Sequence, residues 1–104
     1  CIIHTPRKNK EEITQKILEI LKKVGFPDEL AVVDHVNEKT AGLILDRGYW
    51  AGLTVQLGKL SNEEVKRIVE IYGFERFLLN NDTGFSDEEL FAVSKAVAYL
   101  SKYF

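Results

Sequence analysis

The chain has 104 residues, enough for one domain with one hydrophobic core. Apolar residues make up 45% and charged residues 29%, the balance of a soluble globular domain, and the formal net charge of −2 excludes nucleic-acid binding that rests on overall positive charge. A single cysteine excludes an intramolecular disulfide and fits a reducing compartment such as the cytoplasm, and no apolar run approaches the roughly 20 residues of a membrane-spanning helix.

The first strand–helix unit is predicted at the start of the chain. Residues 1–4 form a short, mostly apolar strand that ends on His4. Asn9, with Glu12 three residues later, predicts a capped helix start, and Gly25 predicts the end of that helix. Between these limits the apolar residues recur at the spacing of one helix face: Ile13, Ile17, Leu18, Ile20, Leu21 and Val24.

The second unit begins with residues 30–33. This apolar run has no polar alternation, which predicts a strand that is covered on both faces, as in a parallel sheet. The run leads into Asp34 and His35. A helix is predicted over about 38–46, and Gly48 is expected to stop it.

Two further units complete the chain. Strands predicted over 50–57 and 76–79 each precede a capping box, SNEE at 61–64 and SDEE at 86–89, in which serine and glutamate side chains bond free amides at a helix start. Gly73 is expected to end the third helix. The buried stripe of the last helix is predicted to comprise Val93, Ala96, Val97 and Leu100.

The order of elements is therefore βαβαβαβα. Strands that alternate with helices imply right-handed crossovers and one parallel sheet with helices packed on it. We predict a single α/β segment over residues 1–104, a parallel (β/α)4 array without a linker or second domain.

Three of the four predicted strands lead into a residue that can bind metal, namely His4, His35 and Asp82. Because all strands of such an array end at the same sheet edge, and parallel neighbours lie about 5 Å apart, we expect His4 and His35 to lie close together. Two imidazoles and a carboxylate suit zinc or another divalent ion. The ordinary alternatives are a loop histidine bonded to a carbonyl, a turn at Asp82, and, for Asp34, a cap or a partner that orients a histidine ring.

Several segments are similar to a known enzyme family. IIHTPR (2–7) resembles the fifth strand of the TatD-related hydrolases, which are amidohydrolase-type (β/α)8 barrels. VVDHVNEKTAGLILDRGYWAGLTV (32–55) resembles the sixth strand through the seventh, and FLLNND (77–82) and SDEELFAVSKAVAYL (86–100) resemble the eighth strand and its helix. YWAGLTV and SDEELFAVSKA are most similar to the archaeal TatD-like branch. The resemblance implies that the chain is the C-terminal half of a TIM barrel, strands 5–8 with their helices.

The resemblance also implies a metal site and a reaction. His4 and His35 would hold one divalent ion with a bridging glutamate from the fourth strand, and Asp82 would bind a second ion and orient or deprotonate the attacking water. The ions would be zinc, manganese or magnesium, and the reaction would be hydrolysis of phosphodiesters, DNA among them, by a metal-activated hydroxide. Where the family ends its eighth strand with Glu-Thr, this chain has Asn80 and Asn81, which removes a negative charge beside the ligands.

A half-barrel has two open sheet edges, and open edges invite pairing. The resemblance therefore implies that the chain is a fragment that contacts a missing N-terminal half or associates with itself. Arg7 and Lys8 are either phosphate contacts or a solvated loop. The alternatives to a hydrolase are an inactive half-barrel used in assembly and a flavodoxin-like binding or signalling domain. The signalling type is opposed by His4, which stands where an acidic pair is needed, and by Asp82, which stands where a lysine is needed.

Overall fold

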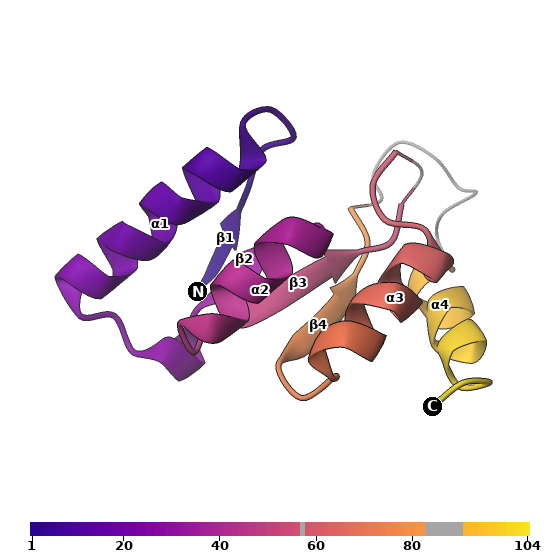
Figure 1. The fold of residues 1–104 in the computed structure, drawn as a ribbon. Coiled ribbons are helices and arrows are strands. Elements are labelled where there is room, and N and C mark those ends of the chain that lie inside the picture. Colours follow the sequence, from indigo (N-terminus) through magenta and orange to yellow (C-terminus); the bar gives the residue numbers. More distant parts are fainter. Residues whose placement is uncertain (57, 83–90) are drawn as a thin grey trace.

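The computed structural model describes residues 1–56, 58–82 and 91–104, along which strands and helices alternate (Figure 1). The strands are β1 (Ile2–His4), β2 (Val32–Asp34), β3 (Trp50–Thr54) and β4 (Phe77–Asn80). The helices are α1 (Lys10–Val24), α2 (Glu38–Asp46), α3 (Asn62–Tyr72) and α4 (Ala92–Leu100), with a 3-10 turn, η1, at Asp28–Leu30. No helix in the three described ranges is both long and apolar enough to cross a membrane.

The four strands form one sheet in chain order, β1-β2-β3-β4, and each neighbouring pair is parallel. The helices contact one another in the same order, α1 with α2, α2 with α3 and α3 with α4, so they lie as one layer beside the sheet (Figure 1). This is the winding of a (β/α)8 barrel, of which four units make half. The predicted parallel (β/α)4 array is confirmed, and a flavodoxin-like domain, whose strands are not in chain order, does not fit.

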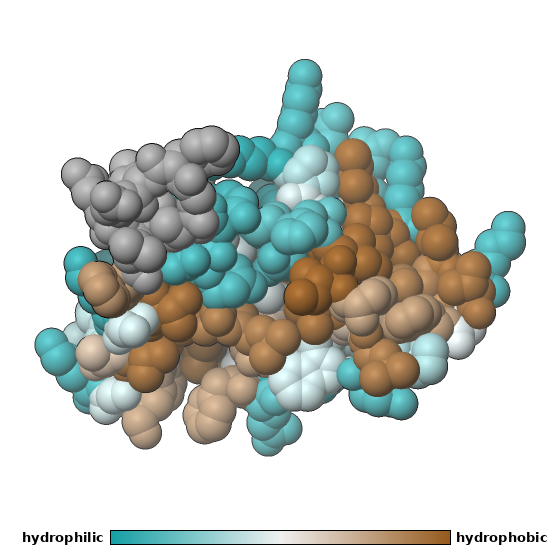
Figure 2. Space-filling model, turned by 180° about the vertical axis from the view of Figure 1, so that it is seen from behind, coloured by the Kyte–Doolittle hydropathy of each residue, from teal (hydrophilic) through white to brown (hydrophobic). Residues whose placement is uncertain are grey.

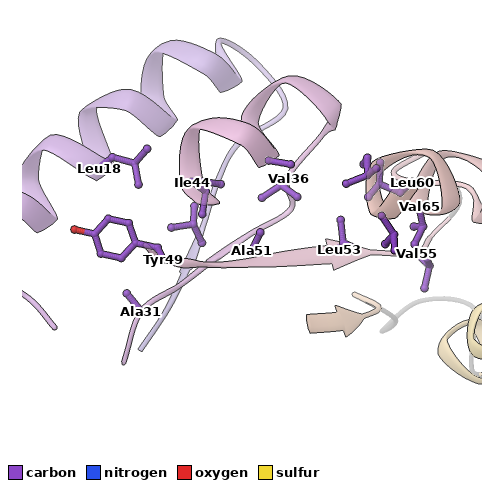
Figure 3. Packing of buried hydrophobic residues seen from close by; sticks show 14 of the residues in the cluster. Leu18, Ala31, Val36, Ile44, Tyr49, Ala51, Leu53, Val55, Leu60 and Val65 are labelled. Carbon is purple, nitrogen blue, oxygen red and sulfur yellow. The ribbon is translucent and has the colours of Figure 1, made fainter. Parts of the chain in front are cut away.

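One face of the sheet packs against the helix layer. Residues paired across parallel strands point to the same face, and Val33 pairs with Ala51 on the helix side, where both are fully buried. They belong to a core that also contains Leu18 of α1 and Ile44 of α2 (Figure 3). The core therefore lies between the sheet and its helices.

The opposite face has no helix over it in the described part of the chain. Ile2 in β1 and Leu78 in β4 point to this face and are 63% and 42% exposed. Figure 2, which views the molecule from behind, shows a band of apolar side chains across it. The prediction that both faces are covered from residue 30 onward is wrong for Leu30, which lies in η1 and is 57% exposed.

The capping residues predicted from the sequence are only partly those found at the helix starts. The predicted box at α3 is confirmed, since Oγ of Ser61 accepts from the Glu64 amide and Oε1 of Glu64 accepts from the Ser61 amide. The predicted cap at Asn9 is wrong: this residue has a left-handed backbone with φ of 56°, and its side chain makes no capping bond. An unpredicted box joins Asn37 and Thr40 at the start of α2.

The last helix buries less of its predicted stripe than expected. Ala96 is fully buried, as expected, and Val93 and Leu100 are partly buried, but Val97 is 51% exposed, since the main helix neighbour of α4 in the described residues is α3. The predicted capping box at 86–89 lies outside the described residues.

Candidate functional site

The ends of β1 and β2 place two histidines and a carboxylate together. The register pairs His4 with Asp34, and His35 follows directly. Successive strand residues normally point to opposite faces, but His35 has a left-handed backbone with φ of 63°, which lets its ring lie on the same side as Asp34. Nε2 of His35 is 2.7 Å from Nδ1 of His4, and one ligand atom from each of the three residues lies within 4.8 Å of the others.

The left-handed turn at His35 is held by polar contacts from the β1–α1 segment. A non-glycine residue in this conformation costs roughly 1–2 kcal/mol, so the surroundings must fix it. Oγ1 of Thr5 donates to the Asp34 carbonyl at 2.8 Å. Nζ of Lys10 donates to the His35 carbonyl at 2.6 Å and to Oγ1 of Thr5 at 3.0 Å. These bonds tie the carbonyls of the turn to the neighbouring strand end.

The Asp34 side chain is 6% exposed, and its carboxyl group is held in place by neighbouring side chains. Nδ2 of Asn80 donates to its Oδ1 at 2.8 Å, and its Oδ2 is 3.5 Å from Nδ1 of His4. A Cβ at Gly52 would lie 2.1 Å from Oδ1, so only glycine leaves room for the carboxyl group there. Although position 80 is an asparagine, this edge of the sheet still has a carboxylate, which Asp34 in β2 supplies.

Thr54 decides which nitrogen of His35 carries the proton. Its Oγ1 is 2.8 Å from Oδ1 of Asn80, which can only accept, so the threonine donates its hydroxyl hydrogen there. Nδ1 of His35 is 2.7 Å from the same Oγ1 and must donate to it, which leaves a lone pair on Nε2. Burial lowers the pKa of His35, and the opposing effect of Asp34 is smaller, so the neutral ring that binds metals is favoured.

The donor set fits a divalent metal ion. Two imidazole nitrogens and a carboxylate oxygen are typical zinc ligands. Two nitrogens bound to one tetrahedral zinc ion, each about 2.1 Å from it, would lie roughly 3.4 Å apart. The histidine nitrogens stand 2.7 Å apart, so the two rings need to separate by less than about 1 Å to accept such an ion.

Asp82 is outside this cluster of three. Nζ of Lys59 donates to its Oδ2 at 2.8 Å, and this bond, with the lysine charge, holds the pKa of Asp82 below its usual range. The carboxylate is thus ionised, and its place as a metal ligand and catalytic group stays a prediction. The structure brings His4 and His35 together as predicted, but the third member in the described chain is Asp34, which the sequence indicated only as a cap or a ring-orienting partner.

Comparisons with known proteins point the same way. No protein-family model matches the chain. An uncharacterized metal-dependent hydrolase of Methanocaldococcus jannaschii is 41% identical over 100 residues, which cover 95% of this chain and 39% of that protein. The crystal structure of a TatD-like protein from Archaeoglobus fulgidus is 44% identical, superposes with a TM-score of 0.76, and is matched over 99% of this chain and 40% of that one. The chain thus spans about two fifths of the length of these relatives.

Proposed function

We propose that this chain, which belongs to the archaeal branch of the TatD-related family, supplies one part of the active site of a metal-dependent hydrolase. The observation that supports this most directly is the meeting of His4, Asp34 and His35 at the C-terminal edge of the sheet. In barrels of this winding the strand C-termini carry the chemistry. Further ligands would come from parts of the protein outside these 104 residues.

In this proposal the three clustered residues and Asp82 have distinct roles. Nε2 of His35 and the His4 ring would hold one zinc, manganese or magnesium ion, and Oδ2 of Asp34, which faces His4, would be a further ligand. A bound divalent ion supplies a water whose pKa falls toward about 7 and offsets negative charge on the attacked ester. Asp82, kept ionised by Lys59, would hold a second ion and would orient or deprotonate the attacking water.

The substrates we propose are phosphodiesters, with DNA among them. The net charge of −2 gives no general attraction to a polyanion, so recognition would depend on local positive groups. Arg7, Lys10 and Lys59 lie at the same sheet edge as the histidine cluster and line one pocket with His35. Their position supports an anionic substrate.

Metal analysis tests this proposal. The purified protein should bind zinc or manganese saturably by isothermal titration, and hydrolysis of bis(p-nitrophenyl) phosphate should require the metal and disappear after chelation. A protein that retains no divalent ion under any of these conditions would remove the basis for the hydrolase assignment. The measurement also separates a hydrolase from a second candidate, an inactive half-barrel used in assembly, which needs no metal.

The sheet face that carries Ile2 and Leu78 has no helix over it in the described residues, which favours association with another protein surface. An assembly role would also require such association. We expect the 104-residue chain alone to self-associate at micromolar concentration through this face, or to bind a protein that carries the other half of the barrel. Ile2→Lys should weaken association by roughly tenfold or more, since a lysine would lose its hydration in an apolar contact. Sedimentation velocity measures the change.

Ile71→Lys is the matched control for this prediction. Ile71 lies in α3, away from the sheet face, and is 55% exposed, close to the 63% of Ile2. The substitution Ile71→Lys therefore adds the same charge at a similarly exposed apolar position. A wild-type chain that remains a well-dispersed monomer would contradict the prediction, as would equal effects of both substitutions.

A further inference from the structure

A pocket of about 410 Å³ opens beside the histidine cluster. Its walls come from the segment after β1, the first residue of α1, the start of α2 and the segment after β3. Three cationic side chains, those of Arg7, Lys10 and Lys59, line it. His35 lines it as well, so the pocket and the candidate metal site share a wall.

The three cations differ in how they are engaged. Lys10 is bonded to the His35 carbonyl and to Thr5, and Lys59 is bonded to Asp82. Arg7 makes no hydrogen bond or ion pair with the described residues, and its guanidinium lies over Gly58, where a Cβ would meet Nη2 at 3.3 Å. Arg7 is therefore the one pocket cation whose donors make no bond within residues 1–56, 58–82 and 91–104.

The acidic side chains that the structure describes near the pocket each have a bonding partner. Glu64 lines the pocket, but its Oε1 accepts from the Ser61 amide in the cap of α3. Asp82 has Lys59 as its partner. Lys10 lines the same pocket as Arg7 and Lys59 and lies within range of both charges, so the described wall of the pocket carries three positive groups. An anion placed among these three cations would relieve their mutual repulsion.

We propose that this pocket is the subsite for a phosphate group of the substrate, with Arg7 as its principal contact and Lys59 as a second. The proposal rests on the proposed function and adds to it the residues that recognise the substrate. The guanidinium fork bonds two oxygens of one phosphate, and the lysine adds a point charge. Because Lys59 also holds Asp82, a phosphate that reaches Lys59 competes with that carboxylate. Lys8 is the next residue after Arg7 but does not line the pocket.

Phosphate binding to the metal-free protein tests this subsite. Inorganic phosphate is titrated by calorimetry into protein kept in a chelator at pH 8, with ionic strength held constant by chloride, so that neither a metal nor a protonated imidazole holds the anion. We expect saturable binding that Arg7→Gln and Lys59→Gln each weaken about tenfold, the effect of one charge-assisted hydrogen bond. Lys8→Gln, the control, should change the affinity less than twofold.

Each outcome bears on the subsite alone. No saturable phosphate binding, or an equal loss of affinity in Lys8→Gln and Arg7→Gln, would overturn it, because the anion would then be held by general surface charge. Circular dichroism of each variant shows that the fold is kept. A zinc titration of the same protein in phosphate-free buffer reports on the hydrolase proposal independently, so either proposal can fail while the other stands.

Discussion

His35→Asn is expected to abolish metal-dependent hydrolysis while the fold is kept. The substitution removes Nε2, the nitrogen whose lone pair is left free by the bond from Nδ1 to Thr54. Without the ion the attacking water keeps its ordinary pKa, so we expect a loss of kcat/KM on the order of 10³-fold or more. Asparagine is the suitable replacement because residue 35 has a φ of 63°, which asparagine tolerates. Initial rates with bis(p-nitrophenyl) phosphate and a zinc titration measure the effect.

Because residue 35 has a left-handed backbone, two further variants are needed to separate loss of the ligand from backbone strain. His35→Ala should lose activity to the same extent and also about 1 kcal/mol of stability, since alanine is strained in the left-handed region. Asn9→Ala also places alanine in a left-handed backbone, at φ of 56°, but outside the site. It should lower the free energy of unfolding by a similar amount and leave activity unchanged. Full activity in a folded His35→Asn protein would show that His35 is not a ligand.

The fold could be predicted from the sequence because its signals are local. Glycines at positions 25 and 73 follow the ends of α1 and α3, and the bounds of α2 match the predicted 38–46. Local signals fail where tertiary contacts decide. Asn9 has the composition of a cap but takes a left-handed backbone, and Val97 has the spacing of a buried stripe but lies where the helix layer ends.

The residues of the candidate site also divide into those that the sequence could predict and those that depend on tertiary contacts. His4 and His35 could be predicted to meet because strand C-termini share an edge, a property of the fold class. Asp34 could not be assigned beside His4, because this depends on the register between β1 and β2, which no local pattern encodes. The same holds for Asn80 in β4, which bonds to Asp34 in β2 across the intervening strand β3. Long-range register therefore decides which carboxylate joins the histidines.

Gly52→Ala tests whether that register places Asp34 in the site. A Cβ at position 52 would lie 2.1 Å from Oδ1 of Asp34 and 3.1 Å from its Cα, so rotation of the carboxyl group alone does not relieve the clash. We expect a loss of about 1–3 kcal/mol in the free energy of unfolding. Displacement of Asp34 from the histidines should also weaken zinc binding by roughly 10–100-fold. Urea unfolding of the metal-free protein and a zinc titration give the two values.

Gly42→Ala is the control, because it adds the same methyl group in a helix away from the site. Its Cβ would meet the outer end of the Tyr72 side chain, with the hydroxyl oxygen at 2.9 Å, and this residue is 39% exposed and held there by one long hydrogen bond of 3.4 Å to the Glu38 carbonyl, so it can shift. Helix propensity favours alanine over glycine by up to about 1 kcal/mol, so stability should be unchanged or higher and zinc affinity unchanged. If Gly52→Ala is as stable as the wild type and binds zinc equally well, the Asp34 carboxyl group does not pack on residue 52, and its role beside His4 is lost.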